Sequence, residues 1–182
     1  IRWLFADGPE AARILDRGNH HWFFPGWTKE ELETPFEGDS VGTYNPAEGK
    51  FRFVSLDVGH EDNIKEFIFQ NQGGITTKPV IGDWDGDQRD SIGVWRYGYF
   101  TLTDVHAPGT ISQVDYYFSF GPVGDDITPI AGDWDGDGKA GVGAYDSSSG
   151  IFYLRNNLNS GDADIIITGQ GPGLSPLVGD WN

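Results

Sequence analysis

Between residues 132 and 138 the chain reads Gly132-Asp133-Trp134-Asp135-Gly136-Asp137-Gly138, with three aspartates at alternate positions. Nearly the same letters stand at residues 82–88, and the last four residues, 179–182, begin a third copy. The first aspartates of these copies are 50 and 47 residues apart. Periods near this length, with four strands in each unit, are typical of propeller blades. The sequence therefore predicts a repeat architecture.

The stretches between the acidic copies alternate short runs of β-branched and aromatic residues with Gly, Pro, Asn, Asp and Ser, which indicates strands and turns. The predicted strands form three matching sets, namely 40–44, 49–54 and 66–70, then 91–95, 98–102 and 115–120, then 141–145, 150–155 and 163–168. We predict an all-β fold of about three four-stranded propeller-type blades and the opening of a fourth. The blades span residues 36–78, 79–128, 129–175 and, in part, 176–182.

The first 35 residues lack this pattern and form a separate, partly helical segment in this interpretation. Asp7, Pro9 and Glu10 resemble a helix start, so a helix is predicted over residues 11–17 with Gly18 as its stop. Thr28 and Glu31 form a second capping-box pattern.

The composition limits the possible partners. With 12 Lys and Arg against 28 Asp and Glu, the formal net charge is −16, which disfavours binding to nucleic acid or to an anionic membrane. Cysteine is absent, so thiolate chemistry is excluded. No apolar run approaches the roughly 20 residues that span a bilayer, and we expect no membrane insertion. Many carboxylates also attract divalent cations.

Residues 132–156 carry a family likeness, because the acidic stretch is followed by Gly-Val-Gly-Ala-Tyr-Asp and then by Gly-Ile-Phe-Tyr-Leu-Arg-Asn. This pattern resembles the FG-GAP/VCBS-type repeats of bacterial extracellular proteins, over roughly residues 36–182. The resemblance implies a calcium-binding β-propeller related in blade design to the integrin α-subunit head. It also implies an extracellular or cell-surface location.

Calcium takes six to eight oxygens, and a loop with carboxylates at positions one, three and five can fold around one ion. Backbone carbonyls of Arg89 and Lys139 would add a ligand to each loop. The predicted metal ligands are Asp83, Asp85, Asp87 and Arg89 in one loop, Asp133, Asp135, Asp137 and Lys139 in the next, and Asp180 and Asn182 in the third. Residues 32–39 lack the acids, so the first unit is expected to hold no ion.

Position nine of the loops, often an acid, is Ser91 in one and Gly141 in the other, which predicts weak sites with affinities of about 0.1 to 1 mM. The alternative is a pair of solvated turns whose aspartates only accept hydrogen bonds from backbone amides. Magnesium fits less well, because it prefers few carboxylates and ordered waters. Zinc would need His or Cys ligands, and the four histidines lack ligand spacing.

The aromatic residues suggest two roles. Trp84, Trp134 and Trp181 recur in one slot, which favours packing between blades over sugar stacking, and Trp95 and Tyr145 also occupy equivalent core positions. The repeat does not explain a group near the N-terminus, which is a candidate partner surface: Trp22, Phe23, Phe24 and Trp27.

No nucleophile elbow, HExxH helix, phosphate loop or isolated carboxylate pair is present, so a non-enzyme is expected. The leading hypothesis is a calcium-stabilised extracellular repeat module that acts in adhesion or binds a glycan or protein. The alternative is a self-associating structural subunit of a fibre or layer, whose incomplete blade is completed by a neighbouring chain.

Overall fold

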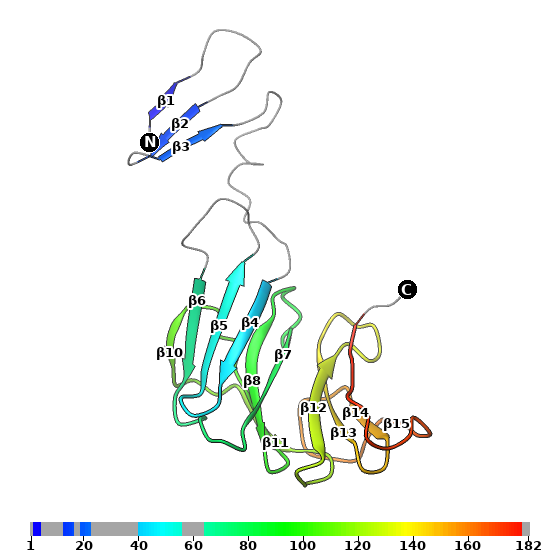
Figure 1. The fold of residues 1–182 in the computed structure, drawn as a ribbon. Coiled ribbons are helices and arrows are strands. Elements are labelled where there is room, and N and C mark those ends of the chain that lie inside the picture. Colours follow the sequence, from blue (N-terminus) through cyan, green and yellow to red (C-terminus); the bar gives the residue numbers. More distant parts are fainter. Residues whose placement is uncertain (1, 5–12, 17–18, 23–39, 56–63, 180–182) are drawn as a thin grey trace. The chain divides into compact units, whose positions relative to one another are not determined.

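The computed structural model describes residues 2–4, 13–16, 19–22, 40–55 and 64–179 (Figure 1). The chain divides into two compact units, Ile1–Gly38 and Asp39–Asn182. In the first unit β1 (Arg2–Leu4), β2 (Arg13–Asp16) and β3 (Asn19–Trp22) form an antiparallel sheet in the order β1-β2-β3. The described residues contain no helix, and hence none that is long and apolar enough to cross a membrane.

The helix predicted over residues 11–17 is wrong where the structure describes it, because Arg13–Asp16 forms β2. This strand pairs with β1 on one side and β3 on the other, with Ile14 opposite Trp3 and His21. A helix of two turns is marginal in water. Sheet pairing on both sides satisfies the same backbone groups, so it overrides the local capping pattern. The turn predicted from Thr28 lies outside the described residues.

The second unit consists of three four-stranded sheets. The first sheet has the order β10-β6-β5-β4, the second β11-β9-β8-β7 and the third β12-β13-β14-β15. Their bounds are β4 (Ser40–Asn45), β5 (Lys50–Ser55), β6 (Ile64–Phe69), β7 (Lys78–Gly82), β8 (Ser91–Arg96), β9 (Tyr99–Leu102), β10 (Gly109–Ile111), β11 (Tyr116–Ser119), β12 (Ile127–Gly132), β13 (Gly141–Asp146), β14 (Ile151–Arg155) and β15 (Ile165–Ile167).

The all-β prediction is confirmed, and each of the nine predicted strands corresponds to an observed strand. Three strands of this unit, β7, β10 and β12, are not among the nine predicted strands. Of these, β10 pairs in parallel with β6 although it belongs to the second repeat. The third repeat makes a similar crossing, since Ser160 lies 3.3 Å from Ser119 at the end of β11, measured between the hydroxyl oxygens. In the second and third repeats, the connection before the last strand thus reaches back to the preceding sheet.

A glycine recurs at the equivalent positions 42, 93 and 143, which we call the glycine slot. In each case a large side chain of the neighbouring strand occupies the space beside the glycine. Gly42 faces Phe53, Gly93 faces Leu102 and Gly143 faces Leu154 in the strand pairs. A Cβ at these glycines would come within 2.5, 2.4 and 2.9 Å of those side chains. The glycine therefore leaves room for a large side chain to lie flat across the neighbouring strand.

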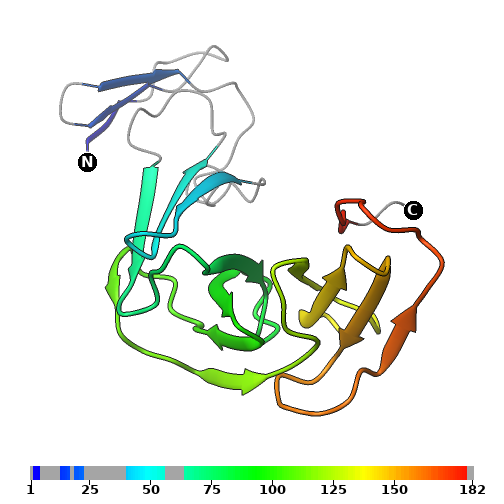
Figure 2. The ribbon, with the colours of Figure 1, turned by 60° about the horizontal axis from the view of Figure 1, so that its bottom comes forward.

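The three sheets pack face to face through two apolar clusters. Phe51 and Phe67 of the first sheet meet Ile92 and Val94 of the second, together with Ile111. The opposite face of the second sheet meets the third in a cluster that includes Val80, Trp84, Trp95, Phe100, Leu102, Phe118, Val142 and Ala144. Figure 2 shows the second sheet, in green, between the first, in cyan, and the third, in yellow and orange. The second sheet therefore contributes both of its faces to the core.

Replacing Gly143 tests the glycine slot. We expect Gly143→Ala to lower the free energy of unfolding by about 1–3 kcal/mol, because its new methyl would overlap Ile130 and Leu154. The control is Gly124→Ala, whose Cβ would meet nothing closer than 3.9 Å. Urea unfolding measures both variants, and equal effects would contradict the steric explanation.

Candidate metal sites

Two acidic loops connect the first and second strands of their sheets. The first acidic loop is residues 83–89, between β7 and β8, and the second is residues 133–139, between β12 and β13. Oδ1 of Asp83 accepts hydrogen bonds from the N–H groups of Gly86 and Asp87, and its Oδ2 accepts one from Gln88. Asp133 accepts the same three bonds, at 2.8, 3.2 and 2.9 Å. The opening aspartate thus shapes each turn.

The other two aspartates repeat their contacts as well. Asp85 and Asp135 each accept the N–H two residues ahead, at 3.1 and 3.3 Å. Each loop offers one oxygen from each of its three carboxylates, and these oxygens lie within 4.8 Å of one another. Each triad could therefore hold a metal ion. Bringing three like charges together is unfavourable without a compensating cation.

The two loops differ at position six. Gln88 has a backbone φ of +67°, and Gly138 in the equivalent place has +88°. Glutamine is strained in this left-handed region, whereas glycine adopts it readily. The same turn is kept despite that cost, which shows that the hydrogen bonds of the loop determine its shape.

The second acidic loop packs directly against the first. The backbone N–H of Ala140 donates to the carbonyl of Asp83 at 2.6 Å. A Cβ at Gly82 would meet both Ala140 and the ring of Trp84, which is only 2% exposed. The ends of both loops line an open hollow of about 310 Å³. The ends of the two loops are therefore in direct contact.

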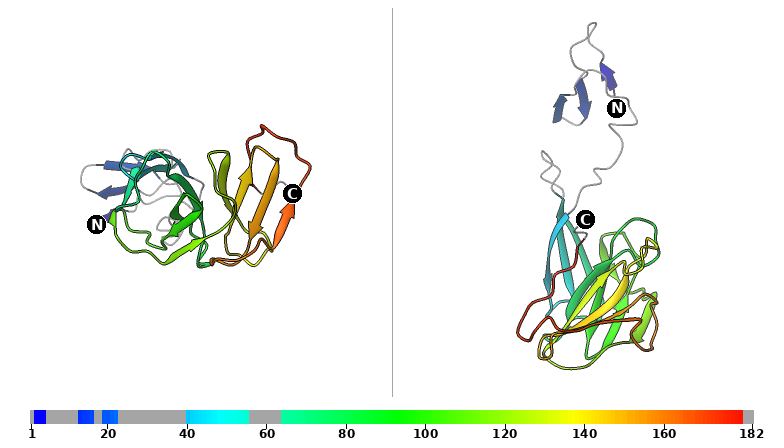
Figure 3. Two further views of the ribbon diagram at one scale, coloured as in Figure 1. Left: turned by 90° about the horizontal axis from the view of Figure 1, so that it is seen from below. Right: turned by 90° about the vertical axis from the view of Figure 1, so that its right-hand side faces the viewer.

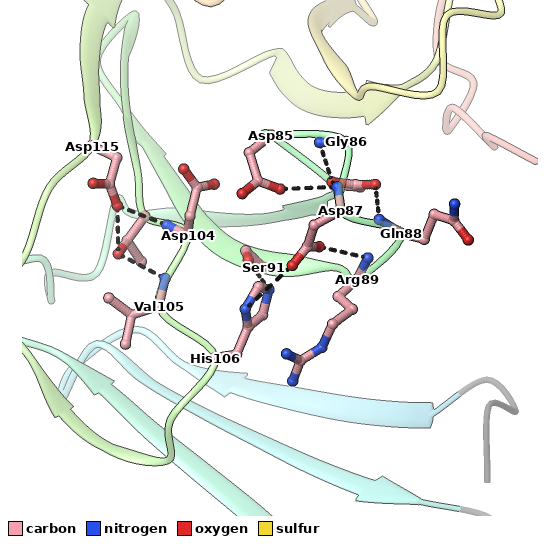
Figure 4. A network of polar contacts seen from close by, with 12 residues as sticks. Asp85, Gly86, Asp87, Gln88, Arg89, Ser91, Asp104, Val105, His106 and Asp115 are labelled. Atoms are coloured by element: carbon pink, nitrogen blue, oxygen red, sulfur yellow. Dashed lines mark hydrogen bonds and ion pairs between the residues drawn. The ribbon is translucent and has the colours of Figure 1, made fainter. Parts of the chain in front are cut away.

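A further oxygen lies across from position nine in both loops. The register of β8 with β9, continued two residues, sets Asp104 opposite Ser91, and that of β13 with β14 sets Asn156 opposite Gly141. Oδ1 of Asp104 and Oδ1 of Asn156 are both buried without a hydrogen-bond partner. Figure 4 shows the Asp104 carboxylate beside Asp85. An unpartnered buried oxygen at this place fits a cation-binding loop.

A further aspartate, outside the triads, holds Asp104 in the first site and Asn156 in the second. Oδ2 of Asp115 accepts the backbone N–H of Asp104 at 2.8 Å, and Oδ2 of Asp164 accepts that of Asn156 at 2.9 Å. Burial acts to raise the pKa of Asp115, but bonds from Asp104, Gln113 and Thr103 outweigh it and leave the pKa lowered. Asp115 is therefore a charged acceptor that fixes the end of β9.

The pKa values of Asp104 and Asp133 are shifted in opposite directions. Burial, followed by the charges of Asp85 and Asp115, raises the pKa of Asp104 to about 6, while His106 and a hydrogen bond from Tyr116 oppose the rise. By contrast, the backbone N–H of Gly138 and three further amides lower the pKa of the exposed Asp133. Ionisation of Asp104 is thus disfavoured at the first site.

Ser91, His106 and Asp87 form a chain that superficially resembles a hydrolase triad. The Ser91 hydroxyl lies 2.8 Å from Nε2 of His106, whose Nδ1 is 3.9 Å from Oδ2 of Asp87. The second distance exceeds a hydrogen bond. Ser91 is only 4% exposed, so a substrate has little access to its hydroxyl. These contacts instead connect the first acidic loop and β8 to the segment after β9.

The structure brings together most of the predicted ligands. Arg89 and Lys139 donate their N–H groups to the third aspartate of each triad, which holds their backbone against it. Asp180 and Asn182 lie outside the described residues, as do residues 32–39, Phe23, Phe24, Trp27 and Trp181. Sequence reasoning missed Asp104, Asn156 and His106, because only strand pairing brings them to the loops.

The predicted packing role of the recurring aromatics is confirmed for three residues. Trp84, Trp95 and Tyr145 are 1–3% exposed and belong to the core. Trp134 is partly buried, and its indole N–H donates to the carbonyl of Val142 at 3.1 Å.

Comparisons of the chain with protein-family models, with curated proteins and with solved structures gave no match. The resemblance to FG-GAP/VCBS-type repeats therefore stays a prediction.

The raised pKa of Asp104 predicts a pH-dependent stability in calcium-free solution. Its folded-state pKa of about 6 exceeds the ordinary value of 3.8, so folding takes up a proton. The stability linked to this group is present below about pH 4 and lost as the pH rises through about 6. We expect Asp104→Asn to be more stable than the parent at neutral pH.

Urea unfolding with chelator, at pH 4 and at neutral pH, measures this effect. The advantage of Asp104→Asn should shrink towards pH 4, and Asp125→Asn, at an exposed site outside the loops, is the control. An advantage independent of pH would overturn the assignment.

Proposed function

We propose that residues 39–182 form a calcium-stabilised module of propeller-type blades in an extracellular or cell-surface protein. Each acidic loop takes one calcium ion, which neutralises its three aspartates and fixes the turn between two strands. The module presents a rigid surface for adhesion or for binding a glycan or protein, and the acidic loops have a structural rather than a catalytic role. The proposal extends the family resemblance noted in the sequence.

The observation that carries this proposal is the duplication of the site beyond its sequence motif. Asp104 and Asn156 both stand opposite position nine of their loops in the strand register, each with a buried oxygen that lacks a hydrogen-bond partner. The backbone N–H of each residue donates to an aspartate, Asp115 for Asp104 and Asp164 for Asn156. We assign them as the oxygen donors that replace the missing side chain at position nine. Calcium fits such a set of flexible, all-oxygen ligands.

Removing calcium should lower the melting temperature of the protein, because an ion that binds only the folded state stabilises it by mass action. At a calcium concentration about tenfold above Kd, each site contributes roughly 1.4 kcal/mol. Two sites together should raise the melting temperature by several degrees. Calorimetric melting with chelator and with calcium measures the difference.

Asp85→Asn and Asp135→Asn should each remove about half of this stabilisation, since each keeps a hydrogen-bond acceptor but loses a ligand charge. Asp125→Asn should retain the full response. Melting curves that are the same with and without calcium would refute the calcium sites.

The two proposed position-nine substitutes give a reciprocal test. Asp104→Asn should weaken calcium binding at the first loop, and Asn156→Asp should strengthen it at the second, each by roughly tenfold, because ligand charge sets affinity. Isothermal titration calorimetry follows both sites. Unchanged affinities in both variants would remove Asp104 and Asn156 from the ligand sets while leaving the triads intact.

A further inference from the structure

The hairpin between β8 and β9 departs from the pattern of the other two sheets. In the first and third sheets the equivalent strands are joined by four residues, 46–49 and 147–150, whereas the second sheet uses only Tyr97 and Gly98. Strand β8 runs from the first acidic loop to this turn, so the turn lies at the opposite end of the strand from the loop. Figure 3 (left) shows this end of the sheets from below. The departure is therefore separate from the candidate metal sites.

Tyr97 has a backbone conformation that its side chain disfavours. Its φ is +50°, and that of Gly98 is +84°. Two-residue turns of this left-handed kind favour Asn or Gly at the first position, and a bulky side chain there is strained. The residue is 54% exposed, so it is not held there by burial in the core. Neither turn geometry nor core packing therefore explains a tyrosine at this position.

Two further exposed tyrosines lie beside this turn. Tyr99 begins β9 and is 47% exposed, and Tyr117 on β11 is 67% exposed. Their rings stack with a centroid distance of 5.5 Å and an interplanar angle of 13°. The stack covers one face of each ring, and the exposure of Tyr117 leaves its other face open to solvent. We call Tyr97, Tyr99 and Tyr117 the tyrosine patch.

Polar groups border the tyrosine patch on the same side of the sheet. Arg96 is directly opposite Tyr99 in the strand register, and its guanidinium carbon lies 5.5 Å from the centroid of the Tyr97 ring. Ser119 is opposite Tyr99 on the other side, and its hydroxyl oxygen lies 3.3 Å from that of Ser160. Directly opposite residues share a face of the sheet. The rings are therefore accompanied by one guanidinium and two hydroxyl groups.

The tyrosine patch is particular to the second sheet. The strand register gives the equivalents of Tyr99 and Tyr117, which are Lys50 and Glu66 in the first sheet and Ile151 and Ile166 in the third. In the first sheet the two side chains form an ion pair at 2.9 Å. The fold thus accepts charged or aliphatic side chains at these positions and does not require aromatic ones.

The size of the patch limits what can cover it. With about 200 Å² for one tyrosine side chain, the three rings expose roughly 330 Å². Two exposed aliphatic residues border them, because Val123 lies against Gly98, and Ile75 follows Gly74, which lies near Arg96. Even with these two, the patch stays below the ~800 Å² that each partner buries in a stable protein–protein interface. A short oligomeric ligand fits this area better than a second copy of the chain.

The chemistry of the patch favours an uncharged sugar. The face of an aromatic ring is negative, so it attracts the weakly positive C–H groups that line one face of a pyranose ring. Hydroxyl and guanidinium groups can form hydrogen bonds with sugar hydroxyls. The net charge of −16 disfavours an anionic glycan, and the positive charge of Arg96 disfavours a cationic ligand. A neutral hexose oligosaccharide therefore matches the patch in size, ring contacts and charge.

We propose that the tyrosine patch binds a neutral hexose oligosaccharide. Sugar rings lie on the open ring faces of Tyr97 and Tyr117, and Arg96, Ser119 and Ser160 form hydrogen bonds with the sugar hydroxyls. This proposal rests on the binding role proposed above and names its ligand and its surface. It does not depend on calcium, because the patch and the first acidic loop lie at opposite ends of β8.

Isothermal titration calorimetry of the 182-residue protein tests the proposal with cellohexaose, laminarihexaose, mannohexaose and maltohexaose. At least one should bind with a Kd of about 0.1–1 mM. Tyr117→Ala should weaken this binding by at least about tenfold, whereas Tyr117→Phe, which keeps the ring, should retain it. The matched control is Ile166→Ala, at the equivalent and similarly exposed position of the third sheet, which should bind like the parent.

A second variant keeps the proposal testable if Tyr117→Ala does not fold. Tyr97→Asn places in the turn a residue that its geometry favours, so it should melt no lower than the parent. It should nevertheless bind the oligosaccharide several-fold more weakly, because one ring is lost. Unchanged binding in both Tyr97→Asn and a folded Tyr117→Ala would overturn the assignment of the patch.

Three other results would also overturn the proposal. The first is no binding of any of the four neutral oligosaccharides at about 10 mM. The second is equally tight binding of hexagalacturonate, which would show that the ligand is not selected for neutrality. The third is a dimer of the parent chain that Tyr117→Ala dissociates, which would assign the patch to a second copy. Titrations with calcium and with chelator separate this test from that of the metal sites, since sugar binding should persist wherever the protein stays folded.

Discussion

The packing of the aromatic face of one sheet onto aliphatic side chains of the next, as Phe51 and Phe67 pack onto Ile92 and Val94, is the contact on which the rest of the Asp39–Asn182 unit depends. A single four-stranded sheet cannot bury its own apolar residues, so it folds only against a neighbour. The glycine slot at residues 42 and 93 makes this contact possible, because it lets Phe53 and Leu102 lie flat beneath the next sheet. Gly143 leaves the same space for Leu154 in the third sheet. Packing therefore explains why a glycine recurs at this position of the repeat.

The acidic loops meet a different requirement. Each must reverse the chain between two strands while its neighbour packs against it, as Ala140 does against Asp83. The opening aspartate achieves the turn with three backbone hydrogen bonds, and the other two carboxylates then lie close to it. Hydrogen bonding shapes the loop, but it leaves the negative charge uncompensated. The proposed calcium ion would remove this conflict. Burial and the charges of Asp85 and Asp115 already raise the pKa of the neighbouring Asp104.

Most of the sheet architecture could be predicted from sequence because it repeats. The nine predicted strands follow short-range alternation and turn residues, whereas β7, β10 and β12 were not predicted. The parallel pairing of β10 with β6 joins two repeats, so no pattern within one repeat reveals it. The N-terminal strand β2 was mistaken for a helix because its capping pattern is local, whereas its pairing is not. Asp104 and Asn156 are separated from their triads by the length of a hairpin. Only the register of the strands reveals them.

The central claim is that each acidic loop binds calcium together with an oxygen from the neighbouring strand. A crystal structure of the protein grown with calcium tests it most directly. The account predicts an ion in each loop, bound by the three carboxylates and by Oδ1 of Asp104 in the first loop or Asn156 in the second. Loops that hold only water, with the aspartates bonded to backbone amides alone, would contradict it.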